Sequence, residues 1–166
     1  EDGIVGSSNT VTITNSAPVI SQLDIVTQRG DQTIYTDDVL SVDVVATDAD
    51  GDAITYTYQW LSSANVLLST NSTFDGQYFD RGDELFVTAT PSDGNGLNGT
   101  GSSVSSSTVL VVNSPPSAPT VSISPVSPIV GDDLTCSVDV PSSDADGDSV
   151  LYTYEWSDSS GIQQTT

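Results

Sequence analysis

Apolar and polar residues alternate along several short stretches of the chain, with a period of two. At the even positions from 40 to 46, Leu, Val, Val and Ala alternate with Ser41, Asp43 and Thr47. Between positions 54 and 60, Ile, Tyr, Tyr and Trp alternate with Thr, Thr and Gln. Such a period puts every second side chain on one face of an extended strand. Both stretches are therefore predicted to be half-buried β-strands, and the aromatic residues of the second are expected to face a core.

The rest of residues 17–114 continues in the same way, with short apolar or Thr-rich runs between Gly- and Asp-containing turns. No stretch has a convincing helical period. About seven short strands in roughly 100 residues are typical of an immunoglobulin-like β-sandwich. The sequence therefore predicts an all-β fold of this kind. Further strands are expected at Leu23–Ile25, Val66–Ser69, Ser72–Phe79, Leu85–Ala89 and Val104–Val112.

One stretch of the chain occurs twice. Asp48–Trp60 and Asp144–Trp156 share the pattern Asp-Ala-Asp-Gly-Asp-x-x-x-Tyr-Thr-Tyr-x-Trp without a gap. A repeat at a fixed distance is the signature of repeated structural units. We therefore expect tandem copies of one domain, each with an acidic loop that leads into its aromatic strand.

The linker sequence also occurs twice and sets the domain boundaries. Val11–Pro18 can be laid over Val109–Pro116, because each is a short strand followed by Asn-Ser and then proline. Residues 1–16 are thus expected to hold the last strand of a preceding repeat. Residues 17–114 form a complete repeat, and residues 115–166 form the front half of the next.

The prolines between Asn113 and Pro119 are expected to stiffen this linker and to stop strand pairing from running through it. A half repeat would leave core residues and strand edges exposed. The sequence is therefore interpreted as a segment of a longer tandem array of repeats.

The charge of the chain narrows the classes of partner. It has 23 acidic residues against two basic ones, Arg29 and Arg81, and a net charge of −21. Binding to nucleic acids or to anionic lipids depends on clustered Lys and Arg, so both are excluded. No apolar run is long enough to cross a bilayer. Self-repulsion makes compaction costly unless cations or salt screen the carboxylates, so divalent cations or a saline medium are expected.

The acidic repeat, the Asn-Ser-Ala-Pro linker and the Pro-Ser-Asp-Gly loop at Pro91–Gly94 together resemble a known class of domain. They are similar to the tandem cadherin-like, immunoglobulin-like and polycystic-kidney-disease-like repeats of large prokaryotic surface and adhesin proteins. The resemblance implies an extracellular location and a role as stalk, shaft, fibre or spacer. In immunoglobulin domains a cysteine of the second strand pairs with one near the end of the domain. The resemblance therefore places any partner of Cys136 beyond residue 166.

The acidic loops are candidate calcium sites. Calcium takes six to eight oxygen ligands, which alternating carboxylates and backbone carbonyls supply, and Gly51 permits a tight bend. In a sandwich of this topology, Asp93 comes from a neighbouring loop, and the second loop faces the Asn113–Pro119 linker and the turn holding Asp80 and Asp83. The other interpretation, a solvated turn without metal, stays open because the EF-hand pattern of ligands is absent. The candidate ligands are Asp48, Asp50, Asp52, Asp93, Asp144, Asp146 and Asp148.

Other motifs have a structural interpretation beside the functional one. Arg81-Gly82-Asp83 is the tripeptide that integrins bind, but it also fits a plain turn before a strand. Asn71 and Asn98 begin Asn-x-Ser/Thr sequons, which matter only where exported proteins are N-glycosylated. The aromatic run at 56–60 is either core or a sugar-stacking platform, and alternation beside an apolar strand favours core.

No catalytic constellation is found, and the chain is not expected to be an enzyme. It has no His or Lys base, and its one cysteine has no basic neighbour in sequence. Three functions are compatible with these features. The first is a calcium-stiffened structural or adhesive segment, with neighbouring repeats as partners. The others are a carbohydrate-binding accessory module of a secreted hydrolase, which would contact cell-surface glycans, and a filament subunit that other copies complete by strand exchange.

Overall fold

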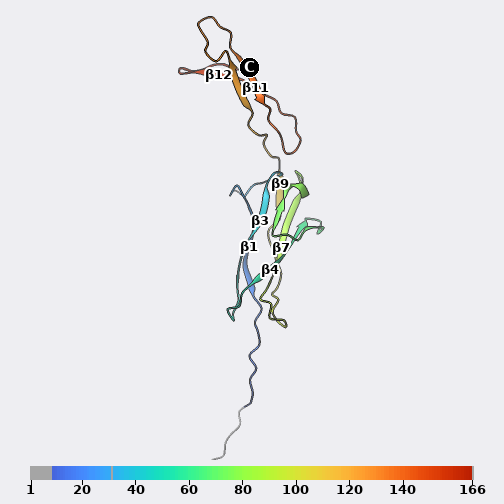
Figure 1. The fold of residues 1–166 in the computed structure, drawn as a ribbon. Helices are drawn as coiled ribbons and strands as arrows, with labels where there is room; N and C mark the ends of the chain where they lie inside the picture. The colour runs from blue at the N-terminus through green and yellow to red at the C-terminus, as the bar shows by residue number, and fades with distance from the viewer. Residues whose placement is uncertain (1–8, 31, 166) are drawn as a thin grey trace, which may run out of the picture.

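The computed structural model describes residues 9–30 and 32–165, with side chains described as far as residue 162. The all-β prediction is confirmed: the described elements are strands and one short 3₁₀ turn (Figure 1). Residues 18–113 form a body of two sheets. The strands of this body are β1 (Val19–Thr27), β2 (Ile34–Tyr35), β3 (Val39–Thr47), β4 (Thr55–Ser62), β5 (Leu67–Ser69), β6 (Thr73–Asp75), β7 (Glu84–Ser92), β8 (Val104–Ser105) and β9 (Val109–Val112).

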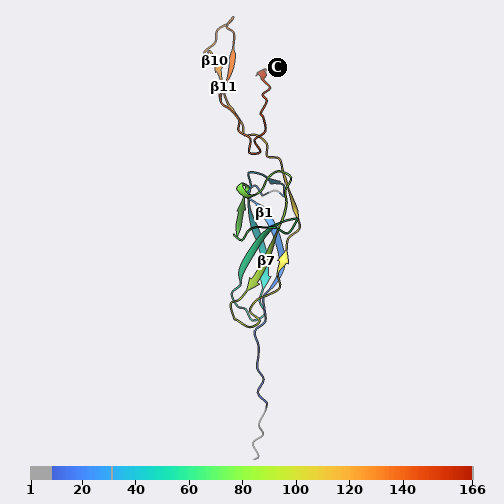
Figure 2. The same cartoon turned by 90° about the vertical axis from the view of Figure 1, so that its right-hand side faces the viewer.

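The two sheets of the body share an interior core. One sheet has the order β1-β3-β6, and the other has the order β2-β9-β7-β4-β5, with β8 also paired to β7. The pairs are antiparallel except β2 with β9, which is parallel. Figure 2 shows the body from the side, with β1 and β7 in its two layers.

Inward-facing residues of both sheets fill this core. Leu40 of β3, Trp60 of β4 and Leu85 of β7 have no exposed surface, and Phe74 of β6 is 2% exposed. The Trp60 and Phe74 rings stack with centroids 5.3 Å apart. Each such side chain contributes about 1.5–3 kcal/mol by leaving water. The period of two therefore identifies the core face correctly at these positions.

Several expected strands have different lengths in the structure. The strand expected at Val104–Val112 is split into β8 and β9, because Ser106 leaves the ladder and exchanges hydrogen bonds of 2.9 and 3.1 Å with Val87. The strand expected at Ser72–Phe79 is shortened to β6 and a 3₁₀ turn at Gly76–Tyr78, where Asp75 accepts a hydrogen bond from the Gln77 N–H at 3.2 Å. The two-residue strand β2 was not expected, because it is too short to show a period.

The last strand of a preceding repeat, expected within residues 1–16, stays a prediction: its described part forms no strand pair with the body. The segment is extended but forms no strand pair, and Val11 and Ile13 are 84% and 90% exposed. Figure 1 shows this segment leaving the end of the body that holds the β3–β4 turn.

Residues 114–165 form two separate hairpins at the other end of the body (Figure 1). Strands are present here, but the expected aromatic strand begins only at Glu155. No described side chain from 115 to 162 is buried, and Val121, Ile123 and Leu151 are more than half exposed. The hairpins are β10 (Thr120–Ser124) with β11 (Thr135–Val140), and β12 (Glu155–Asp158) with β13 (Gly161–Thr165).

Candidate metal and linker site

The first acidic loop connects β3 to β4 and folds around Asp48. Its Oδ1 accepts hydrogen bonds from the backbone N–H groups of Asp50 and Asp52, at 2.8 and 3.3 Å. Gly51, with φ of +81°, supplies the left-handed residue that the bend requires. Asp50 then turns outward, and its Oδ2 accepts the N–H of Ser16 at 2.7 Å. The loop therefore holds the linker that enters the body.

The second acidic loop repeats this geometry. Asp144 Oδ1 accepts from the backbone N–H groups of Asp146 and Asp148, at 3.0 and 3.1 Å. Gly147 has φ of +74°. Asp146 Oδ2 accepts the N–H of Ser114 at 2.7 Å, the same length as in the first copy. Repeated sequence thus gives a repeated contact between each loop and the linker before it.

The asparagine of each linker, Asn15 or Asn113, also forms hydrogen bonds at its junction. The side-chain amide of Asn113 donates to the carbonyl oxygen of Ser114 at 2.8 Å, and Asn15 makes the matching bond to Ser16 at 3.4 Å. The Asn15 amide also donates to Asp93 Oδ2 at 2.8 Å, and this bond lowers the pKa of Asp93. Asp93 therefore lies beside the linker and the first loop.

The last carboxylate of each loop has a different partner. Asp52 Oδ2 accepts from the Asn95 amide at 2.7 Å, within the same body. Asp148 Oδ2 instead pairs with Arg81 Nη1 at 2.6 Å, and Arg81 also donates to Asn113. The hydrogen bond to Asp148 raises the pKa of Arg81, and the nearby carboxylates add to the effect. The body of residues 18–113 thus supplies a cation to the loop that follows it.

The second arginine, Arg29, forms ion pairs at the same end of the body, next to Ser114. Arg29 pairs with Asp37 at 2.5 Å and with the buried carboxylate of Asp38 at 2.7 Å. Asp37 in turn accepts the hydroxyl of Ser114 at 2.9 Å. Partial burial raises the pKa of Asp37, but the bonds from Ser114 and Arg29 outweigh it and the net shift is downward. Tyr35 packs beneath the Arg29 guanidinium, 4.8 Å from its ring centroid.

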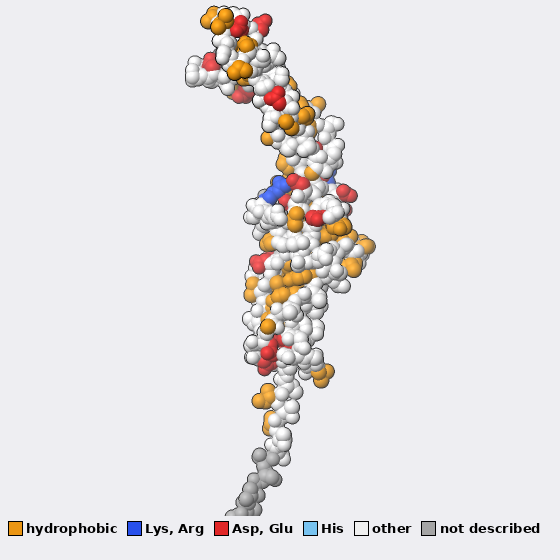
Figure 3. All heavy atoms as spheres, in the orientation of Figure 1, with side chains coloured by type: hydrophobic (Ala, Val, Ile, Leu, Met, Phe, Trp, Pro, Cys, Tyr) orange, Lys and Arg blue, Asp and Glu red, His pale blue; other side chains and the backbone are white. Residues whose placement is uncertain are grey.

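Ser114 is the residue where these contacts meet. Its side chain is fully buried, its hydroxyl bonds Thr36 at 2.7 Å as well as Asp37, and its N–H bonds Asp146. Figure 3 shows the blue arginine side chains near the junction with the upper hairpins, beside red acidic groups. Both basic residues of the chain are therefore used around this one linker.

The carboxylates of the two loops differ in how well they fit a metal ion. Among the described residues, no three acidic, His or Cys side chains converge as a ligand set. Asp48 Oδ2 is a buried side-chain oxygen that has no hydrogen-bond partner in the described chain. Burying an unsatisfied carboxylate oxygen is costly. The first loop therefore fits a cation better than the second, where Arg81 already neutralises Asp148.

The Arg-Gly-Asp tripeptide lies in a turn at this junction. Asp83 accepts the N–H of Asp80 at 2.9 Å and donates its own N–H back at 3.0 Å, while Gly82 has φ of +94°. Because Arg81 is bound to Asp148, the tripeptide acts here as a turn and an ion-pair donor.

The aromatic run of β4 is buried unevenly. Trp60 is fully buried, whereas Tyr56 and Tyr58 are half-buried and stack on each other at 6.2 Å. Burial raises the pKa of Tyr58, with Tyr56 acting in the same direction. The two tyrosines line an open groove of about 710 Å³. Tyr78, which stacks on Phe74, is 55% exposed.

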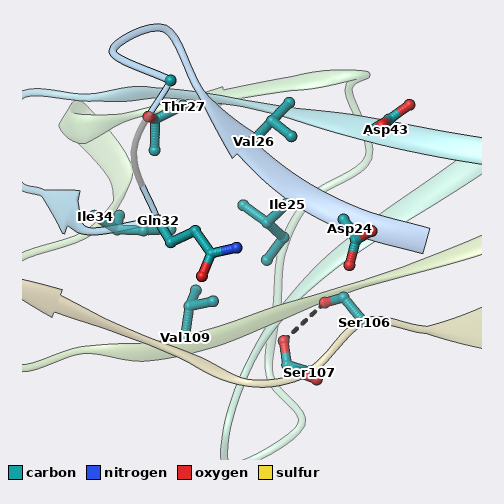
Figure 4. A pocket seen from close by; sticks show the side chains of 11 residues that line it. Asp24, Ile25, Val26, Thr27, Gln32, Ile34, Asp43, Ser106, Ser107 and Val109 are labelled. Carbon is teal, nitrogen blue, oxygen red and sulfur yellow. Dashed lines mark hydrogen bonds between the residues drawn. The ribbon is translucent and has the colours of Figure 1, made fainter. Parts of the chain in front are cut away.

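A hollow of about 490 Å³ opens on the other side of the body, between β1 and the chain that leads into β9 (Figure 4). Asp24 and Asp43, which face each other across β1 and β3, lie at its rim, and Ser106 and Ser107 lie opposite Asp24. The hollow offers carboxylates, hydroxyls and the Gln32 amide. No His or Lys occurs in the sequence to act as a base beside them.

The two sequons lie in exposed turns. Asn71 is in the bend between β5 and β6, and Asn98, with φ of +66°, is in the turn after β7. Cys136 of β11 is half-buried and is a free thiol in the described structure. None of the described helical turns is long and apolar enough to cross a membrane.

Comparison of the chain with protein-family models, curated proteins and solved structures finds no match. Sequence reasoning missed the roles of Arg29, Arg81 and Ser114. The sequence did indicate that the arginines form ion pairs, because they are the only two basic residues beside 23 acidic ones. Ser114 carried no signal beyond its place in the repeated Asn-Ser linker.

Proposed function

We propose that the chain is a structural or adhesive segment of an extracellular surface protein or fibre, built from immunoglobulin-like repeats. The repeated linker contact carries this proposal: Ser16 to Asp50 and Ser114 to Asp146, both at 2.7 Å. A loop that holds the incoming linker limits bending between units. Repeats joined in this way add length while keeping their direction, which is what a stalk or spacer requires.

The strand order supports the immunoglobulin-like part of the proposal. The orders β1-β3-β6 and β2-β9-β7-β4-β5 correspond to the A-B-E and A′-G-F-C-C′ sheets of such a sandwich. The buried Trp60 occupies β4, the position of the third long strand, as in immunoglobulin domains.

Calcium is the cofactor that the proposal assigns to the acidic loops. At the first loop, Asp48, Asp50, Asp52 and Asp93 would hold the ion, and the unpartnered Asp48 Oδ2 supports this assignment. At the second loop, Asp144, Asp146 and Asp148 would do so in competition with Arg81. The ion would offset the mutual repulsion of carboxylates in a chain of charge −21.

The test is thermal unfolding of the whole chain with millimolar calcium or with a chelator, together with small-angle scattering. Calcium is expected to raise the melting temperature by roughly 4 °C or more. Asp48→Asn is expected to reduce that rise, while Asp133→Asn, an equal charge change remote from both loops, keeps it. Identical melting curves and scattering profiles with calcium and with chelator would remove calcium from the account.

One observation favours the filament subunit as a second candidate. Val11 and Ile13 are exposed on an extended, unpaired segment, and the hairpins of residues 115–162 expose Val121 and Ile123. A strand from a second copy would cover such apolar residues. Sedimentation velocity of the chain in high salt tests this: association that Ile13→Asp abolishes supports it, and a monomer at every concentration rejects it.

A further inference from the structure

The groove beside Tyr56 and Tyr58 lies where the body is open along one side. β5 pairs with β4 only at Trp60 and Leu61, so the Thr55–Gln59 part of β4 is a sheet edge in the described chain. β6 likewise pairs with β3 only from Val39 to Ser41. An open edge with apolar side chains attracts foreign strands unless it is covered.

Burial falls along both strands toward this open side. Leu40 and Trp60 are fully buried where β5 and β6 cover them. Further along, Val44, Tyr56 and Tyr58 are only half-buried. The groove therefore presents aromatic surface together with polar groups, the mixture that small-ligand sites show. Its other lining residues are Thr57, Gln59, Thr70, Asn71, Ser72 and Thr90.

Asn71 is fixed in the wall of this groove. Its carbonyl oxygen accepts the indole N–H of the buried Trp60 at 3.0 Å, and its N–H donates to the Ser69 hydroxyl at 3.2 Å. Its side chain is exposed, and no hydrogen bond to the described residues uses its Nδ2. Asn71-Ser72-Thr73 is a sequon, so an N-glycosylation acceptor residue lines the same groove as two half-buried tyrosines.

We propose that Asn71 carries an N-linked glycan whose first sugars lie in the groove and pack their C–H faces on Tyr56 and Tyr58. The glycan covers the open β4 edge and completes the burial of the two rings. Its first sugars are neutral hexoses or N-acetylhexosamines, because a uronic acid would add negative charge to a chain of charge −21.

The attachment step forms one bond and breaks one. Asn71 Nδ2 bonds to C1 of the reducing-end sugar, and the isoprenoid phosphate or pyrophosphate of a lipid-linked oligosaccharide leaves with the C1–O electron pair. One Nδ2 proton passes to the transferase, and no redox change occurs. The inference rests on the export that the proposed function assumes.

Asn98 is the matched control within the chain. It also begins an exposed sequon, but its turn packs against acidic and amide groups, where its carbonyl accepts from Asn15 at 3.2 Å. The described hydrogen bonds of that turn involve amide and carboxylate groups and no tyrosine, so attachment there is expected to leave the stability of the body unchanged.

The test expresses the full chain with a secretion signal in a host that N-glycosylates, with an extra sequon in an added flexible tail as internal standard. Peptide mass spectrometry is expected to find Asn71 occupied, and occupancy to disappear in Thr73→Ala. The glycan at Asn71 is expected to raise the melting temperature by about 4 °C relative to Thr73→Ala. In Tyr58→Ser this gain is expected to fall by at least half, and Thr100→Ala, which removes the Asn98 sequon, is expected to change nothing.

Three results would overturn the inference. The first is a modified standard tail with Asn71 unmodified, and the second is an Asn71 glycan whose stabilisation is the same in Tyr58→Ser. The third is free neutral oligosaccharide shifting the Tyr56 and Tyr58 NMR signals of unglycosylated protein at millimolar concentration, which would make the groove a lectin site. The calcium dependence of the melting temperature and the scattering profile are measured on the same samples. These test the proposed function independently of whether Asn71 carries a glycan.

Discussion

Ser114 donates its backbone N–H to Oδ2 of Asp146 at 2.7 Å, across the junction between the body and the hairpins that follow it. The buried hydroxyl of Ser114 meanwhile bonds Thr36 and Asp37 of the body. One small residue therefore contacts both sides of the junction. Because Arg81 bridges the same two sides through Asn113 and Asp148, the junction is held at two points.

Replacing Ser114 tests the first of these points. Ser114→Ala removes a buried hydroxyl and leaves Thr36 without its partner, which is expected to cost about 1–2 kcal/mol of unfolding free energy. Urea denaturation followed by tryptophan fluorescence measures this loss. Ser117→Ala is the control, because Ser117 is exposed and its hydroxyl bonds only Ser143 among the described residues. A loss below about 0.5 kcal/mol is therefore expected. Equal losses in both variants would contradict the buried role of Ser114.

The same variant predicts a pH dependence. The pKa of Asp37 lies below its ordinary value of 3.8 in the folded protein, and Ser114 contributes to this shift. A lowered folded pKa gives stability that is fully present above the unfolded pKa and is lost as the pH falls through the folded value. The stability difference between the unaltered chain and Ser114→Ala is therefore expected to shrink below about pH 3.8. It should not vanish, because the bond to Thr36 does not titrate. Denaturation series at pH 6 and pH 3 measure it, and a larger difference at pH 3 would refute the assignment.

The two tryptophans occupy corresponding places in the repeat but differ in burial. Trp60 is fully buried, while Trp156 is half-buried among hairpins that bury no described side chain. Trp60→Ala is expected to cost about 3–5 kcal/mol, and Trp156→Ala less than about 1 kcal/mol. Circular dichroism during urea denaturation compares them. A large effect of Trp156→Ala would mean that residues 115–165 form a core of their own.

These tryptophans also show how far the sequence could predict the fold. The period of two around Trp60 identified the strand and its inward face, because packing of one face decides both. The identical pattern around Trp156 predicted the same strand, but β12 begins only at Glu155. Local pattern was not sufficient there, since a half-buried strand also needs an opposing sheet, and the described chain supplies none to these hairpins.

The candidate site was predictable in its repeated part and in the topology that brings Asp93 and the turn of Asp80 and Asp83 near the loops. Asp50 and Asp146 belong to a motif that is visible twice, so their shared role could be anticipated. Arg81 reaches Asp148 across 67 positions, a contact that depends on the turn geometry at Gly82 and the path of the linker. No local pattern encodes such a contact.

The ion pair between Arg81 and Asp148 is expected to weaken calcium binding at the second loop. Its guanidinium occupies Asp148 Oδ2, so a metal ion must compete with it. Arg81→Gln is expected to strengthen calcium binding by the chain in titration calorimetry, either as higher affinity or as an additional site. Arg29→Gln removes the same charge without touching the second loop and is expected to leave calcium binding nearly unchanged. An isotherm that Arg81→Gln does not alter would show that this loop does not bind calcium.

The central claim is that contacts of Ser114, Arg81 and Asp146 fix the direction of the chain across the junction. The most direct test is a distance measurement by pulsed electron paramagnetic resonance, with one spin label on Cys136 and a second on Thr57→Cys, an exposed position of β4. We predict one narrow distance distribution, which broadens in Arg81→Gln/Asp146→Ala and stays narrow in the control Asp133→Ala. A broad distribution with the junction intact, or an equal width in all three proteins, would contradict the claim.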